Sequence, residues 1–322
     1  MRSNQTYEWH RMIIPTPFPV GPVNVYLVKA DPLTLIDTGP NTPVAREAIT
    51  AALAGVGVTP GDIKRILVTH GHGDHSGLAG WFREMGAQVY VHPKEAGKLT
   101  GRDILSDREV LFRQVGVPGA LLESLRPLAR HTARYNGSLE DYQPIKGGEE
   151  IPFDGFTLSV MATPGHTGGH LVFYQRETGV MFAGDTILKD ISPNPLPEPE
   201  PESPGGRTRS LAEFLATLDR LERVPAQVAL PGHGDPLSDH TGRIMEMRDH
   251  HRQRVLRLLE ELQDFASPYE LASRLFGDLA GLDILLGVSE VCAHLDLMLD
   301  RGQITEQVGT DGVVRYITGN QS

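Results

Sequence analysis

Cysteine is almost absent from this chain of 322 residues: the single one is Cys292. One cysteine cannot form a disulfide within the chain, and it cannot supply a cysteine-rich metal site. Both a disulfide framework and a cysteine-based metal site are therefore excluded. A chain of this length can nevertheless bury a large core and add a smaller domain.

Positive charge is also in short supply. The chain has 30 Lys and Arg residues against 41 Asp and Glu residues, which gives a formal net charge of -11 at pH 7. Nucleic acids and anionic membranes attract proteins through clustered positive charge, so this balance excludes a broad basic surface for such partners. Nucleic acid is therefore a disfavoured partner, and a small-molecule substrate is expected instead.

Long apolar runs are missing as well. No uninterrupted stretch of about 18 apolar residues is present that could span a bilayer. Residues 1–12 are polar, and prolines at positions 15, 17, 19 and 22 follow at once, which is unlike the apolar segment of a signal peptide. From these two absences we expect a cytoplasmic protein without a membrane partner.

The most informative stretch that is present is residues 69–75, with the sequence Thr-His-Gly-His-Gly-Asp-His. Residues 65–68 before it form an apolar run that predicts a buried strand, so the stretch lies where a strand ends and the chain turns. The intervening glycines allow turn conformations that bring neighbouring side chains together. Imidazole nitrogens and a carboxylate oxygen suit zinc, iron or manganese. His70, His72, Asp74 and His75 therefore predict a metal site.

Three further candidate ligands repeat this arrangement: His166, Asp185 and His233. Each follows a short apolar run and has glycine beside it. Such a repetition is expected when the strand ends of a layered sheet structure line one edge of a cleft, because functional residues gather on loops that a rigid scaffold holds.

These motifs resemble the HxHxDH dinuclear hydrolases of the metallo-β-lactamase fold superfamily, over about residues 12–250. The resemblance implies an α/β protein with an αββα sandwich. It also implies metal ligands in two sets with a bridge: His70, His72 and His166 for a first ion, Asp74, His75 and His233 for a second, and Asp185 between them. Two zinc ions are the expected cofactor, although iron or manganese would also fit. Asp37 would orient a ligand histidine or cap its turn, and His170 would have a supporting role.

The chemistry expected of such a site is hydrolysis. Two metal ions about 3.5–4 Å apart can share a water molecule and lower its pKa toward neutrality. We therefore expect a metal-bridging hydroxide as nucleophile, with Asp185 setting the metal spacing and Asp74 orienting the nucleophile. The expected substrate is a small acyl ester, thioester or lactone, because the net charge is acidic and the C-terminal segment, residues 266–322, is not basic. The chain is also similar to hydroxyacylglutathione hydrolase. Cleavage of single-stranded RNA, iron-based redox chemistry and a binding protein with a vestigial site are the alternatives.

Residues 1–265 are expected to form the catalytic domain. Apolar runs and alternation predict strands at residues 23–29, 33–36, 65–68, 88–91, 153–161, 171–174, 180–182 and 227–230. Helical spacing predicts helices at residues 43–54, 76–85, 211–221 and 241–265, the last as one long helix or two abutting ones. This alternation of strands and helices agrees with the sandwich that the resemblance implies.

Two segments exceed the minimal fold. Residues 94–145 predict a helical insertion, with helices at residues 107–115 and 118–131, that could pack over the cleft and set specificity. Its polar residues either meet an anionic substrate or form a solvated helix face: Arg126, Arg130, His131, Arg134 and Tyr135. His92, at a strand end, is a weaker candidate for substrate contact. The proline-rich residues 191–206 predict a loop near the cleft mouth, either a linker, a flap or a subunit contact.

Residues 266–322 predict a second, smaller domain. Helices ending near residue 276 and at residues 288–299, followed by a hairpin at residues 302–306 and 313–317, resemble the winged-helix tail of a superfamily subgroup that includes a β-lactamase-like endoribonuclease. The second helix carries Glu290, Asp296 and Asp300 against Arg301 alone. Such a helix reads nucleic acid poorly, because binding rests on positive charge against phosphates. We therefore expect a packing or dimerising module, and the protein could form a homodimer.

Overall fold

The fold is built on two β-sheets. The computed structural model describes residues 8–101, 103–199 and 206–319. The first sheet has six strands that pair in chain order: β1 (Trp9–Ile14), β2 (Val23–Val28), β3 (Thr34–Ile36), β4 (Arg65–Leu67), β5 (Gln88–Val91) and β6 (Gln143–Pro144). The second has five strands in the order β11-β10-β9-β8-β7: β7 (Glu150–Phe153), β8 (Phe156–Ala162), β9 (Leu171–Gln175), β10 (Val180–Gly184) and β11 (Val228–Pro231). Pairing is parallel from β3 to β6 and between β10 and β11, and antiparallel elsewhere.

The sheets stack face to face because side chains along each strand alternate between two apolar layers. In β10, Val180 and Phe182 lie in the layer between the sheets, whereas Met181 and Ala183 pack toward the outer helices. Tyr26 of β2 reaches the same inter-sheet layer from the opposite side. The strand ends are thereby fixed by two cores at once.

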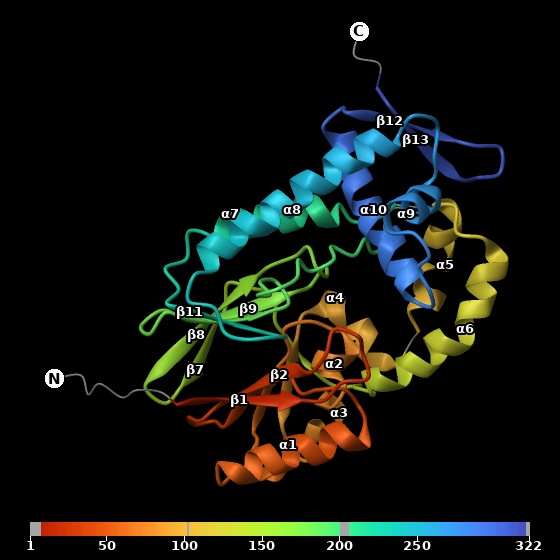
Figure 1. Cartoon of the computed structure of the whole chain (residues 1–322). Helices are drawn as coiled ribbons and strands as arrows, with labels where there is room; N and C mark the ends of the chain where they lie inside the picture. The colour runs from red at the N-terminus through yellow and green to blue at the C-terminus, as the bar shows by residue number, and fades with distance from the viewer. Residues whose placement is uncertain (1–7, 102, 200–205, 320–322) are drawn as a thin grey trace.

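Helices cover the outer face of each sheet. Helix α1 (Pro43–Gly55) begins after Thr42, whose side chain caps its first turn. Helices α1 and α3 (Ala79–Glu84) pack on the first sheet, and α7 (Ser210–Leu221) and α8 (His240–Glu261) pack on the second (Figure 1). This order of layers confirms the αββα sandwich.

Several elements differ from the prediction. Strand β1 was not predicted, because its sequence shows no regular alternation and only Met12 and Ile14 are buried. The single helix predicted at residues 76–85 is wrong: α2 (Gly73–Ser76) and α3 are separate. Gly77 keeps helical dihedral angles, and the interruption falls at Leu78, whose ψ is 4°; a Cβ on Gly77 would collide with the backbone oxygen of Tyr135. Helix α10 begins at Asp283, five residues before the predicted start, with Gly287 inside the helix.

The helical insertion packs against the C-terminal segment. The insertion contains α4 (Pro93–Ala96), η2 (Gly97–Thr100), α5 (Ile104–Gln114), α6 (Gly119–Ala133) and η3 (Arg134–Asn136), and η1 (Pro60–Asp62) precedes β4. The C-terminal segment contains α9 (Pro268–Phe276), α10 (Asp283–Asp300) and the hairpin of β12 (Ile304–Val308) and β13 (Val314–Thr318). Helices α5 and α6 lie beside α9 and α10 (Figure 1). Phe112 and Leu122 of the insertion share one core with Leu258, Val291 and Tyr316.

The C-terminal helix α10 lies in this shared core. Helix α10 is buried along most of its length, since it packs against α7, α8 and α9. The predicted order of helix, helix and hairpin is present, and its assignment as a winged helix stays a prediction. Among the residues that the structure describes, no helix combines the length and apolar character needed to cross a lipid bilayer.

Candidate metal centre

The candidate ligands meet where strands of both sheets end. Strand β4 leads into His70, His72, Asp74 and His75, and β8 leads into His166. Asp185 directly follows β10, and His233 follows β11. Their nitrogen and oxygen atoms form three overlapping groups that could each hold a metal ion: His70, His72 and His166; His70, His75 and Asp185; and Asp74, His75 and His233. Residues that lie far apart in the sequence are thus brought into one centre.

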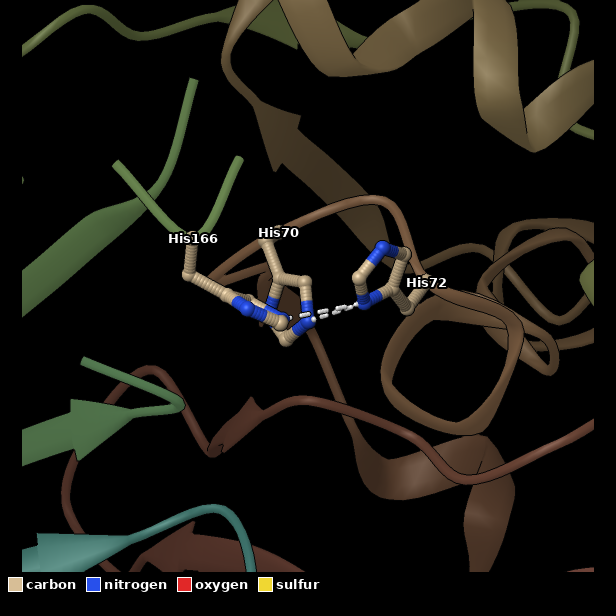
Figure 2. Close-up of side chains that lie close together, drawn as sticks. All are labelled: His70, His72 and His166. Atoms are coloured by element: carbon tan, nitrogen blue, oxygen red, sulfur yellow. Dashed lines mark hydrogen bonds between the residues drawn. The ribbon is translucent and has the colours of Figure 1, made fainter. Parts of the chain in front are cut away.

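The first group consists of three histidines whose rings are turned toward one another (Figure 2). His70 Nε2 lies 3.0 Å from His72 Nδ1, and His166 Nε2 lies 3.2 Å from the same His72 nitrogen. Ligands bound about 2.1 Å from a tetrahedral zinc ion lie about 3.4 Å from each other. The spacing of these nitrogens therefore approaches that of ligands around one ion.

The second group adjoins the first. His75 Nε2 lies 3.3 Å from His233 Nε2, and His233 Nε2 lies 3.3 Å from Asp74 Oδ2. His70 and His75 are fully buried, and Asp74 and His233 are nearly so. The second group therefore offers two imidazoles and one carboxylate at spacings close to those of the first.

Asp185 stands between the two groups. Its Oδ1 lies 3.4 Å from His75 Nε2, and its Oδ2 lies 3.8 Å from His166 Nε2 and 3.7 Å from His233 Nε2. A Cβ on Gly232 would collide with Asp185 Oδ1, so glycine at that position keeps room for the carboxylate. One carboxylate thus faces both groups, as the bridging role requires.

Hydrogen bonds on the outer side of the rings fix where the protons lie. His75 Nδ1 donates to Asp37 Oδ2 at 2.8 Å, His166 Nδ1 donates to the Asn194 carbonyl at 2.9 Å, and His233 Nδ1 donates to the Pro22 carbonyl at 2.8 Å. A neutral imidazole carries one proton, so a ring that donates from Nδ1 has a bare Nε2. The inner nitrogens of these rings are therefore acceptors.

The inner nitrogen of His70 is also an acceptor, because the outer nitrogen of the ring donates to the Thr69 hydroxyl, which donates to Asp37. The Thr69 hydroxyl donates to Asp37 Oδ2 at 2.8 Å, so its oxygen accepts from His70 Nδ1 at 3.1 Å. Within the first group, only His72 could turn a proton inward, and one proton cannot serve both His70 and His166. Acceptors that face each other in a buried site repel unless a cation lies between them. The residues present therefore fit divalent metal ions.

The pKa values of the ligands agree with this need for positive charge. Burial, followed by neighbouring histidines, keeps the pKa of His70 and His72 well below its usual range, so both rings are neutral, which is the state in which an imidazole can bind a metal ion. Burial opposes ionisation of Asp185, yet His75 and His233 hold the pKa of its carboxyl well below the usual range. Burial also opposes a charge on His75, but Asp185, Asp74 and Asp37 outweigh it and raise its pKa well above the usual range. Without a metal ion its inner Nε2 would therefore carry a proton, and a bound ion would take the place of that proton. The carboxylates therefore stay ionised and attract cations.

Asp37 orients the centre from below. Its carboxylate accepts from the Thr69 backbone N–H at 2.8 Å as well as from the Thr69 hydroxyl and His75. Its φ of 62° lies in the left-handed region, which non-glycine residues adopt at an energetic cost. Residues with such strained backbones are concentrated at functional sites. Partners of this kind fix the tautomer and the direction of a ligand histidine. The orienting role considered for Asp37 is therefore the one its contacts support.

His170 supports the centre without joining the ligand groups. Its ring stacks on His70 with centroids 5.0 Å apart, and its Nε2 accepts from the Asp185 backbone N–H at 3.1 Å. The hydroxyls of Thr163 and Thr186 contact its Nδ1. Both nitrogens are thus used by neighbours, as expected for a structural residue.

Other residues singled out in the sequence have different surroundings. His92 caps α4, since its Nδ1 accepts from the Lys94 backbone N–H at 3.1 Å. Arg126 pairs with Glu109 and Glu123 at 2.5 and 2.9 Å. Neither contact involves the metal centre, and these two side chains are engaged within the insertion itself.

The proline-rich segment, predicted to lie near the site, also provides a backbone acceptor to the centre, which the sequence did not indicate. Residues 200–205 lie outside the described residues, but residues 191–199 run beside His166. Asn194 provides the carbonyl that orients His166, and its side chain donates to the Leu286 carbonyl at 2.8 Å. A backbone acceptor leaves no mark in the sequence, so only the structure could reveal it.

An αββα sandwich with adjoining histidine and carboxylate groups at one edge of its sheets defines a metal-binding protein of the metallo-β-lactamase fold. The sequence profile described as "Metallo-beta-lactamase superfamily" matches residues 18–233. This chain belongs to that superfamily.

Individual relatives resemble nearly the whole chain. A Bacillus subtilis protein named "Probable metallo-hydrolase YqjP" is 33% identical over 301 residues, which cover 91% of this chain and 92% of that protein. The crystal structure of a metallo-beta-lactamase family protein from Thermus thermophilus matches with a TM-score of 0.83 and 32% identity, over 97% of this chain and 98% of that one. A more distant relative, the atrochrysone carboxyl ACP thioesterase of Aspergillus fumigatus, is 22% identical over 271 residues, which cover 81% of this chain and 50% of that protein.

Proposed function

We propose that this chain is a dinuclear metal-dependent hydrolase that cleaves a small acyl ester, thioester or lactone. The observation that carries the proposal is the pair of adjoining ligand groups whose inner nitrogens, in the neutral rings, are acceptors that face one another. Zinc is the default ion for mixed imidazole and carboxylate ligands, and iron or manganese would also fit. The ligands are divided as the family resemblance implies: His70, His72 and His166 for the first ion, Asp74, His75 and His233 for the second, and Asp185 for both.

The chain's own residues prepare the site for this reaction. Two bound ions would supply hydroxide from water at neutral pH and would polarise the group under attack. Asp185 stays ionised in its buried position and holds the two ligand groups at a fixed separation. The Asp74 carboxylate, 3.3 Å from His233 Nε2, is positioned to accept a hydrogen bond from the attacking water. Asp37 and the Asn194 carbonyl keep the ligand rings in one tautomer throughout the reaction.

Several observations support an acyl substrate. One relative is named a thioesterase, and the formal net charge of -11 disfavours a polyanionic partner. The insertion's Arg126 is neutralised by two glutamates. In α10, Asp296 pairs with Arg207 and Arg209 at 2.6 and 2.8 Å, and the helix is buried on most sides. A helix buried in this way is not available to enter a nucleic-acid groove.

Phosphodiester cleavage in single-stranded RNA is the second candidate. The helix, helix and hairpin order of residues 268–318 favours it, because the sequence resembles the winged-helix tail of an endoribonuclease subgroup. The two candidates share one metal centre and differ in the surface that approaches the substrate. A substrate panel therefore separates them without further structural knowledge.

The test is turnover by the metal-loaded protein against a thioester, a lactone and a phosphodiester of similar size. We expect acyl substrates to be cleaved at rates that disappear when Asp185 is changed to alanine. Preference for the phosphodiester by more than about tenfold in kcat/KM would favour the second candidate. Metal binding without turnover on any of the three would favour a binding protein with a vestigial site, and one iron ion per chain would favour redox chemistry.

A further inference from the structure

Glu95 is a buried carboxylate at the metal centre that is not one of the ligands. It lies on α4, at the start of the helical insertion, and its side chain is fully buried. Its Oε2 accepts a hydrogen bond from the Gly71 backbone N–H at 2.8 Å, and its Oε1 accepts from the Gly169 backbone N–H at 2.7 Å. Gly71 stands between His70 and His72 in the chain. The two oxygens of one carboxylate thus join two separate turns that carry ligands of the first group.

The two turns are shaped to receive this carboxylate. A Cβ on Gly71 would lie 3.0 Å from Glu95 Oε2, and a Cβ on Gly169 would lie 2.8 Å from Glu95 Oε1. Any side chain at either position would therefore push the carboxylate away from the backbone it binds. Gly169 follows His166 by three residues, so its N–H belongs to the turn that carries this ligand. Glu95 thus links the two turns through its side chain, beside the backbone hydrogen bond from the Leu171 N–H to the Thr69 carbonyl at 2.8 Å.

The charge on Glu95 is balanced by a small network. Lys98 Nζ lies 2.7 Å from Glu95 Oε2 and 2.5 Å from Glu198 Oε1, and Arg108 Nη2 lies 3.2 Å from the same Glu198 oxygen. Burial opposes ionisation of Glu95, but Lys98 and the Gly71 N–H lower its pKa to about 2. The network contains equal numbers of carboxylates and cations. Because its charges balance, the network has no excess positive charge for an anionic substrate, and its hydrogen bonds hold the two turns in place.

We propose that Glu95 is a positioning residue for the first metal position, where it holds the turn of His70 and His72 at a fixed distance from the turn of His166. Lys98 and Glu198 extend this hold to the proline-rich segment. The proposal rests on the metal-dependent function proposed above, but it does not depend on the substrate. Partners that orient ligands in this way change metal affinity about 10–100-fold when they are removed.

The experiment is a titration of metal-free protein with Zn²⁺ against a competing chelator, with Glu95→Ala, Glu95→Gln and the control Glu47→Gln. Glu47 is an exposed carboxylate on α1, away from the centre. To assign the effect to one position, each Glu95 variant is also made in two backgrounds. His233→Ala removes a ligand of the second group and keeps the first, whereas His72→Ala does the reverse.

We expect Glu95→Ala to weaken Zn²⁺ binding about 10–100-fold in the His233→Ala background and less than about twofold in the His72→Ala background. Glu95→Gln should lie between, because its amide oxygen can accept one of the two N–H groups and its NH₂ group cannot accept the other. If Glu95→Ala does not fold, the Gln variant of the same size carries the test. The Co²⁺ absorption spectrum of the first position should change in the same order, which a loss of global stability alone would not produce.

Two results would overturn the proposal: unchanged affinity in both backgrounds, or an equal loss in both, which would indicate general destabilisation. Wild-type protein that binds Zn²⁺ at neither position would overturn the proposed function as well. Wild-type protein that binds two ions while Glu95→Ala behaves like Glu47→Gln would contradict only the role of Glu95. The two failures are therefore distinguishable.

Discussion

The protein contains two groups of buried histidines, and they differ in where their protons lie. In the metal centre, four rings donate outward to fixed acceptors, so in the neutral rings the inner nitrogens face one another as acceptors. Between α8 and α10, His251 and His294 form a closed pair outside the metal centre, with His251 Nδ1 3.1 Å from His294 Nε2. Both groups are deeply buried. Only the metal centre requires a cation.

The pair of His251 and His294 is closed in the sense that every ring nitrogen has a hydrogen-bond partner of the opposite kind. His294 Nδ1 donates to the Glu290 carbonyl at 2.7 Å, so its Nε2 accepts from His251 Nδ1. His251 Nε2 then accepts from the Ser192 hydroxyl at 3.1 Å. Burial, together with nearby positive groups, lowers the pKa of His251 to about 2 and that of His294 to about 4. Two neutral rings therefore satisfy each other without an ion.

This difference teaches that proximity of buried histidines does not by itself make a metal site. The direction of the outer hydrogen bonds decides the matter, because it determines whether the inner nitrogens can pair among themselves. Changing the metal centre or the pair of His251 and His294, and measuring the effect on the other, tests this difference.

The largest effect is expected when a ligand of the metal centre is removed. His72→Ala or Asp185→Ala should abolish hydrolysis and reduce metal content from about two ions per chain, as expected for a two-metal site, to about one or fewer. The fold should persist, since both side chains lie at strand ends rather than in an apolar core. Elemental analysis and circular dichroism check this, and activity at the wild-type level in either variant would contradict it.

The second largest effect concerns the closed pair. His251→Ala removes a buried ring and leaves its hydrogen-bond partners unsatisfied, so the free energy of unfolding should fall by about 3 kcal/mol. Metal content should not change. His250→Ala is the matched control, because His250 is the neighbouring, exposed histidine of the same helix, and its effect should be about 0.5 kcal/mol or less. Loss of metal in His251→Ala would show that the groups are not independent.

A smaller effect is expected when the outer hydrogen bonds of the metal centre are weakened. Asp37→Asn keeps the size of the side chain, but while its oxygen accepts from His75 and the Thr69 hydroxyl, its NH₂ group cannot accept from the Thr69 backbone N–H. Metal affinity should fall about 10–100-fold while the ligands stay in place. Competition with a chelator measures it, and wild-type affinity would mean that the ring orientation does not depend on Asp37.

The smallest effect is a pH dependence that the closed pair imparts. The pKa of His251 is lowered in the folded protein, so the unfolded chain takes up its proton first as the pH falls below about 6.5. Stability from this group is complete above that pH and is lost as the pH falls. Between about pH 6.5 and 5, metal-free wild type should lose about 2 kcal/mol more than metal-free His251→Phe. Urea unfolding at several pH values tests this, and parallel curves would argue against it.

Much of the metal centre could be predicted from the sequence. Side chains that bind metal are chemically distinctive, and their positions after apolar runs mark strand ends, so His70, His166, Asp185 and the others were identified as candidates and the structure brings them together. The αββα sandwich followed from the family resemblance and from the alternation of strands and helices. Whether each candidate binds an ion stays a prediction for the measurements above.

Other parts could not be predicted, for physical reasons. The partners of Glu95 are backbone N–H groups, and the acceptor of His166 is the Asn194 carbonyl, so residue identity carries no signal for either. Helical spacing in the insertion indicates an apolar face but not what covers it. The structure shows that α5 and α6 share a core with α8, α9 and α10.

The central claim is that the inward-facing acceptors of the metal centre require cations. The most direct measurement is the metal content of wild-type protein beside His251→Ala, both purified without chelator or added metal. The account predicts about two divalent ions per chain in each protein. A folded wild-type protein that hydrolyses its substrate with no metal above background would contradict the account.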